Sequence, residues 1–174
     1  MQSNLIRILD LVSSRNVLLG SGLATVFAML GFQWLEGQIG APMLDTMANY
    51  QRDELVEHML LYGEAGRVLH ARFTASLDMA FPFIYGPFFA GLLTLAARHT
   101  LVPFPGVLVL PVMLVDVLEN IQLIALLWGF PDLETQAITL AGQTSAVKIL
   151  LIQIVFAALP LLLLWQLFVR RKNA

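Results

Sequence analysis

Four apolar stretches, each long enough to cross a lipid bilayer, constrain this chain more than any other feature of its sequence. A helix needs about 20 predominantly apolar residues to span a hydrocarbon core about 30 Å thick. The stretches cover residues 16–35, 74–97, 106–129 and 146–168. Because a spanning helix satisfies its own backbone hydrogen bonds, we expect an all-α integral membrane protein. It would be a four-transmembrane-helix bundle, formed as one membrane domain by residues 1–174.

The composition agrees with this fold class and narrows the range of functions. Only 13% of the residues are charged, against about 25% in soluble domains. Cysteine is absent, which excludes disulfides and thiolate metal sites. The net charge of -2 gives no reason to expect a nucleic-acid partner. The first stretch is longer than the core of a signal peptide and lacks a small-residue cleavage site, so we expect it to be retained.

Basic residues are distributed unevenly between the two sides of the predicted bundle. Six lie on the side of the two termini: Arg7, Arg15, Arg98, Arg170, Arg171 and Lys172. Four lie on the other side: Arg52, Arg67, Arg72 and Lys148. The positive-inside rule therefore predicts cytoplasmic N- and C-termini in a multi-pass protein of a cell membrane, of the bacterial inner-membrane type.

Residues 36–73 form the longest segment outside the apolar stretches, and we predict an amphipathic, helical extracytoplasmic loop. Pro42 suits the first turn of a helix. Apolar residues then recur every three or four positions: Leu44, Met47, Ala48, Leu55, Met59 and Tyr62. Gly63 and Gly66 are expected to break or bend this helix. The loop could lie on the outer leaflet or cap the mouth of the bundle, and residues 130–145 would form a second, shorter outer loop.

The third stretch carries ionisable residues in its middle, within "PVMLVDVLENIQLIALL" at residues 111–127. Asp116, Glu119 and Asn120 are spaced i, i+3, i+4 and therefore share one helical face. Inserting both acids into a bilayer costs about 5–7 kcal/mol on biological scales. Such residues face the bundle interior or a wet cavity. Two carboxylates so close and out of bulk water do not both ionise freely, so one would hold a proton or a cation would lie beside them.

The second stretch adds an acid beside a proline. Asp78 precedes Pro82 by four residues, so the carbonyl of residue 78 lacks its helical donor. Pro87 acts in the same way on residue 83, and Tyr85 lies at the expected bend. On a continuous helix, Arg67 falls on the same stripe as Asp78.

Further polar residues gather towards the outer half of the bundle. Lys148 begins the fourth stretch, and Gln153 lies deeper in it. His70 and Arg72 follow Arg67 closely and are expected to anchor the chain at the interface. Gly20 and Gly22 would allow helices to pack closely.

Each polar group also has a purely structural interpretation. Asp116, Glu119 and Asn120 could only fix helix packing, but interhelical hydrogen bonds contribute about 0.6 kcal/mol each on average, far less than insertion costs. Function is therefore favoured for these three residues. Asp78 could instead be a helix cap or a partner of Arg67.

Our leading hypothesis is a membrane-embedded enzyme, an isomerase or a hydrolase, or a binding protein for a membrane lipid or another apolar small molecule. In the enzyme, Asp116 and Glu119 would act as general acid and base. The full set of catalytic candidates is Asp116, Glu119 and Asp78, and the substrate-binding candidates are Asn120, Arg67, Tyr85, Lys148 and Gln153. The spacing requires no metal site and indicates no particular cofactor.

Two alternatives belong to other functional classes. A small proton- or cation-coupled transporter could use the same acids and would pair as a homodimer. An assembly or scaffold protein would dock a partner through residues 36–73. The sequence does not give the ligand or the reaction.

Overall fold

The computed structural model describes residues 2–98 and 104–172, and these ranges contain helices but no β-strand. The elements in order are α1 (Gln2–Val12), α2 (Arg15–Ile39), the 3-10 turn η1 (Leu44–Thr46), α3 (Arg52–Phe73), the π-helical turn η2 (Thr74–Asp78), α4 (Met79–Ala96), the 3-10 turn η3 (Pro105–Leu108), α5 (Val109–Gly129) and α6 (Thr135–Lys172). The all-helical fold predicted from the sequence is confirmed.

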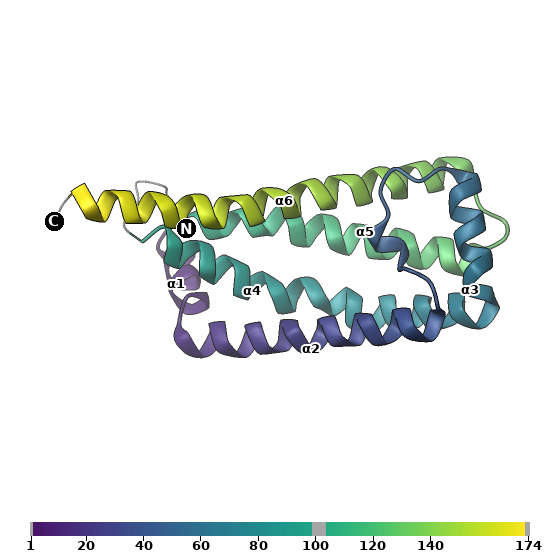
Figure 1. Ribbon diagram of the computed structural model, residues 1–174, viewed down its shortest axis with the longest axis horizontal. Helices are drawn as coiled ribbons and strands as arrows, with labels where there is room; N and C mark the ends of the chain where they lie inside the picture. Colours follow the sequence, from purple (N-terminus) through teal and green to yellow (C-terminus); the bar gives the residue numbers. More distant parts are fainter. Residues whose placement is uncertain (1, 99–103, 173–174) are drawn as a thin grey trace.

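Four long helices, α2, α4, α5 and α6, run along the length of the molecule (Figure 1). The segments long and apolar enough to cross a membrane are Arg15–Ile39, Arg52–Ala96, Pro105–Gly129 and Thr135–Val169. A helix of 25 residues, such as α2, is about 37 Å long, which exceeds the thickness of the hydrocarbon core. The start of α2 and the last turns of α6 lie at the same end of the bundle, while α3 crosses the opposite end.

The outer faces of these helices are strongly apolar. Exposed large side chains include Leu23 and Phe27 on α2 and Leu161 and Leu164 on α6. Contiguous apolar surface of this kind is rare on monomeric soluble proteins. The inward faces are apolar over most of their area and also carry buried polar residues, among them Asp78, Asp116, Glu119 and Lys148.

Close approaches between helices occur at particular glycines. A Cβ atom at Gly91 of α4 would overlap the carbonyl oxygen of Val12, at the end of α1. A Cβ atom at Gly22 of α2 would lie 2.9 Å from the ring of Phe88. Gly22 thus allows close packing as expected, whereas Gly20 has nothing within 4 Å of its Cβ position.

The segment between α2 and α4 differs in part from the prediction. No α-helix begins at Pro42; the chain instead leaves α2, makes η1, and starts α3 only at Arg52. Asn49 adopts a φ of 54°, a left-handed conformation that asparagine tolerates. The chain needs this non-helical stretch because it crosses from the end of α2 to the first turns of α6 (Figure 1). Gly63 interrupts α3 with a φ of 63°, which agrees with the expected break.

Helix α3 caps the end of the bundle and does not stand apart from it. Leu55, Met59 and Tyr62 of α3 are buried against Leu35 of α2 and Leu123 of α5 in one apolar cluster. The apolar face of the predicted amphipathic loop is thus used inside the protein itself. This arrangement matches the expectation that residues 36–73 cap the mouth of the bundle.

The connection between α5 and α6 is shorter than expected. Helix α6 begins at Thr135, not near residue 146, so the loop predicted for residues 130–145 is largely helical. Ile138, Ala141 and Ser145 bury one face of this extension. The added turns of α6 contact the α2–α3 connection. The backbone amide of Asn49 donates a hydrogen bond of 2.9 Å to the carbonyl of Gly142.

Candidate functional site

The three polar residues of α5 all lie inside the bundle. Asp116, Glu119 and Asn120 are buried, and their shared face turns towards α4 and α6. Regular helical geometry over Val109–Gly129 keeps the i, i+3, i+4 stripe intact. These residues therefore do not face the exposed apolar surface.

Lys148 of α6 supplies positive charge to these acids. Its ammonium group forms an ion pair with Glu119 and lies 3.7 Å from Oδ1 of Asp116. A third acid, Asp45, lies 3.9 Å away. One ammonium group is thus shared by three carboxylates, and Glu119 is its nearest partner.

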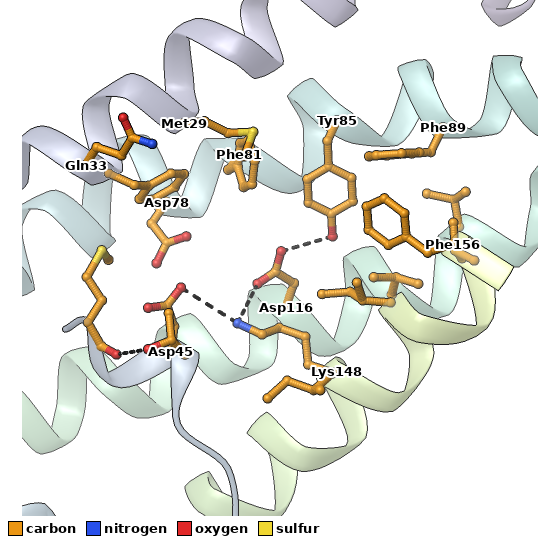
Figure 2. Close-up of a pocket in the computed structure, with 18 of the residues that line it drawn as sticks. Met29, Gln33, Asp45, Asp78, Phe81, Tyr85, Phe89, Asp116, Lys148 and Phe156 are labelled. Carbon is orange, nitrogen blue, oxygen red and sulfur yellow. Dashed lines mark hydrogen bonds and ion pairs between the residues drawn. The ribbon is translucent and has the colours of Figure 1, made fainter. Parts of the chain in front are cut away.

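Tyr85 of α4 contacts the same network from the other side. Its hydroxyl donates a hydrogen bond of 2.9 Å to Oδ2 of Asp116, so this carboxylate is held by Tyr85 at one oxygen and faces Lys148 with the other (Figure 2). A carboxylate fixed at both oxygens has a defined orientation. Asp116 therefore has a partner at each of its two carboxylate oxygens.

Asp78 lies at the end of the π-helical turn η2, directly before α4. Its side chain is 3% exposed and points into the same space as Asp45 and Asp116 (Figure 2). Within the described residues, its Oδ2 atom has no hydrogen-bond partner. Asp78 is thus buried with an unpartnered carboxylate oxygen, a state that normally requires a water or a ligand.

These residues line a cavity of about 420 Å³ between the four long helices. Each helix contributes positions three or four residues apart, which lie on one face. Met29, Phe32, Gln33 and Glu36 come from α2; Asp78, Phe81, Tyr85 and Phe89 from η2 and α4; Val109, Val112 and Asp116 from α5; and Lys148, Ile149, Ile152, Val155 and Phe156 from α6. The α2–α3 connection adds Met43, Asp45 and Thr46.

The cavity has a polar part and an apolar part. Its carboxylates and Lys148 lie towards the end covered by the α2–α3 connection, and Phe89 and Phe156 lie further along the bundle (Figure 2). Met29 and Gln33 of α2 and Phe156 of α6 are exposed to the outside. The cavity therefore opens sideways between α2 and α6, on the apolar flank of the molecule.

Sequence reasoning missed Asp45, which comes from the α2–α3 connection. The connection is held by hydrogen bonds from Tyr62 to the carbonyl of Pro42, 2.5 Å long, and from the Met43 amide to Oε1 of Glu36, 3.3 Å long. Burial raises the pKa of Tyr50, at the end of the same connection, to about 12, so its hydroxyl stays neutral. No local pattern marks Asp45, because an isolated acid in a polar loop is ordinarily a surface residue.

Four predicted site residues do not line the cavity. Glu119 lies behind Lys148, and Asn120 is buried beside it along α5, with no hydrogen-bond partner for its amide in the described part of the chain. Gln153 is exposed on α6. Arg67 donates a hydrogen bond of 3.0 Å to the carbonyl of Met59 and stacks over the ring of Phe130.

The position of Arg67 has a physical cause. The prediction put Arg67 and Asp78 on one stripe of a continuous α-helix, but η2 lies between them. A π-helical turn inserts an extra residue and so rotates the next turns of the helix about its axis. His70, expected to be an interfacial anchor, is also placed differently, because its side chain is fully buried.

The cluster does not have the geometry of a metal centre. Among the described residues, no three histidine or acidic side chains are arranged so that they could hold one metal ion. The chemistry available is that of carboxylates, a phenol and one ammonium group. Comparisons with protein-family models, with curated proteins and with solved structures found no match to this chain.

Proposed function

We propose that this protein spans a membrane and binds an amphiphilic, lipid-like molecule in the cavity between α2, α4, α5 and α6. The single observation that carries the proposal is the form of the cavity, which is polar at one end, apolar along its length and open towards the apolar flank. Ligand sites are mostly apolar, with a few polar groups that fix orientation. The ligand would enter from the bilayer between α2 and α6, with its tail along Phe89 and Phe156.

In this proposal the four long segments are transmembrane helices and α3 lies on the extracytoplasmic side. The distribution of lysine and arginine supports cytoplasmic termini. The polar end of the cavity would then lie near the outer surface, in a membrane of the bacterial inner-membrane type.

A second step of the proposal is acid–base chemistry on the bound molecule. Asp78 and Asp116 face one space in different surroundings, since Asp116 is held by Tyr85 and Lys148 whereas Asp78 has an unpartnered oxygen. Carboxylate pairs in unequal environments can divide the roles of acid and base. Glu119, which does not line the cavity, would instead position Lys148. Proton-transfer isomerisation or hydrolysis fits this arrangement.

The two alternatives receive less support. A transporter needs a polar route through the bundle, and the apolar part of the cavity offers none beyond Tyr85. A scaffold would need the apolar face of residues 36–73, but Leu44, Leu55 and Met59 are buried in the protein's own core.

The test is photolabelling with a bilayer lipid analogue. The protein is reconstituted in nanodiscs with a long-chain diazirine probe, irradiated and digested. We expect label on cavity residues of α4 and α6, such as Phe89 and Phe156, and competition by unlabelled lipid extract. Label restricted to outward residues such as Phe27 and Leu164, without competition, would contradict the proposal. Mass spectrometry of the recovered lipids, compared between wild type and Asp116→Asn, tests for turnover.

A further inference from the structure

We infer that the head group bound in this cavity is an organic cation, an amine or quaternary ammonium group attached to a long apolar tail. This inference rests on the proposed function and deepens it, because it names the chemical class of the ligand. It is carried by the balance of charge around the cavity and by the orientation of Asp78.

Negative groups outnumber positive groups at the polar end. Glu36, Asp45, Asp78 and Asp116 line the cavity, and Glu119 lies directly behind. Lys148 is the one lysine or arginine among the lining residues of the described chain. Its ammonium group is already shared by Glu119, Asp116 and Asp45. The excess of buried acids at this end of the cavity therefore favours bound protons or a positively charged guest.

Asp78 is the group that a positively charged guest would meet. Its side chain is 3% exposed, has no ion-pair partner in the described structure and keeps an unpartnered Oδ2. Figure 2 shows its carboxylate directed into the cavity, opposite Asp45 and Asp116. A protonated amine placed between them would donate charge-assisted hydrogen bonds to these carboxylates, whereas a quaternary ammonium group would be attracted to them by its charge alone.

The size and lining of the cavity favour an organic cation over a metal ion. The carboxylates are not arranged to share one metal ion among the described residues. The ring centroids of Phe81 and Tyr85 lie 5.0 Å apart beside Asp78. Phe89 packs next to Tyr85, so the three rings form an aromatic wall along the cavity. Aromatic faces attract ammonium groups, so the rings of Phe81 and Tyr85 and the carboxylates would act on the same head group.

An anionic head group fits the site poorly. A phosphate or carboxylate would face Asp45, Asp78 and Asp116, and like charges at close range in a poorly solvated site are strongly repulsive. Lys148 could bind such a ligand only by weakening its ion pair with Glu119. In this inference Asp78, a catalytic candidate from the sequence, contacts the head group, while Lys148, a substrate-binding candidate, neutralises the surrounding acids.

The experiment compares probes that share one tail and differ in charge. Full-length protein in nanodiscs of a neutral glycolipid, which carries no ammonium group, is photolabelled with a diazirine-bearing long-chain amine. The unlabelled competitors are a long-chain amine, a fatty alcohol and a fatty acid of equal length. A short-chain amine is added as a competitor without a tail. We expect the long-chain amine to compete about tenfold better than the alcohol, since hydrogen bonds to charged groups contribute on that order.

Two variants make the comparison specific. Asp78→Asn keeps the size of the side chain and should weaken competition by the amine about tenfold, while leaving that by the alcohol unchanged. Asp53→Asn removes an acid that is exposed on α3 and should change neither. Asp78→Glu, which retains the charge, should keep the preference for the amine over the alcohol, and loss of that preference would contradict the role of the charge at Asp78.

The outcomes separate this inference from the proposed function. Equal competition by amine, alcohol and acid would overturn the cationic head group but leave lipid binding intact. Label outside the cavity for every probe would overturn both. If the short-chain amine competes as well as the long-chain amine, the site binds an organic cation, but that cation does not need a tail and does not have to come from the bilayer.

Discussion

Lys148 and Glu119 form an ion pair in the interior of the bundle, with side chains that are 7% and 0% exposed. The pair joins α6 to α5 beside the α2–α3 connection, because the ammonium group of Lys148 also lies 3.9 Å from Asp45. Buried ion pairs are often no more stable than apolar substitutes, but removing one partner leaves an uncompensated charge. The pair therefore makes packing of α5 on α6 dependent on both residues.

The first prediction concerns this dependence. Lys148→Met should lower the free energy of unfolding by about 3–5 kcal/mol, because Glu119 remains buried without its cation. The double variant Lys148→Met/Glu119→Gln should recover much of this loss. Thermal unfolding in nanodiscs measures both, with Arg98→Gln as an exposed control for the same change in charge. Additive losses in the double variant would show that the two side chains do not interact.

The second prediction concerns the hydrogen bond between Tyr85 and Asp116. Tyr85→Phe and Asp116→Asn should be coupled in a double-mutant cycle by about 0.5–3 kcal/mol, as expected of residues in direct contact. Phe83→Leu is a suitable control, because Phe83 lies on the exposed side of α4. A coupling energy near zero would mean that the hydroxyl does not reach the carboxylate.

The helices and the inward position of the acids could be predicted from the sequence because both arise from local patterns. Length and hydropathy identify the long helices. The spacing of Asp116, Glu119 and Asn120 places them on one face, whatever the partner helices are. Lys148 and Tyr85 could be identified as candidates because polar groups in apolar stretches are unusual.

The rest of the site depends on tertiary structure that no local pattern encodes. Asp45 reaches the cavity because the α2–α3 connection folds back over the bundle. The displacement of Arg67 is due to the π-helical turn at Thr74–Asp78, which adds one residue to the helix and leaves no clear mark in composition. The separation of Glu119 from the cavity reflects where Lys148 lies, and this depends on the packing of α6.

The third prediction concerns the close approach of α1 to α4. Gly91→Ala should destabilise the protein by about 1–3 kcal/mol, because the added methyl group overlaps the backbone carbonyl of Val12 and this carbonyl cannot move independently. Gly20→Ala is the matched control, since nothing lies within 4 Å of its Cβ position. Thermal unfolding of the two variants provides the comparison. Equal melting temperatures would place α1 away from Gly91.

The fourth prediction concerns orientation in the membrane. Because the chain has no cysteine, single cysteines can be introduced at exposed positions: Asn4, Gln51 and Asp132. A membrane-impermeant maleimide should label Gln51→Cys and Asp132→Cys in intact spheroplasts, and Asn4→Cys only after permeabilisation. The reverse labelling pattern would show that the protein has the opposite orientation, with the polar end of the cavity towards the cytoplasm.

The most direct measurement is a structure of the protein extracted together with its native lipids, determined by electron microscopy with a rigid binding fragment. We predict an elongated density between α2 and α6, with its head beside Asp78 and Asp116 and its tail along Phe89 and Phe156. Asp78 or Asp116 facing the surrounding lipid, or a cavity closed by direct contact of α2 with α6, would contradict lipid binding at this site.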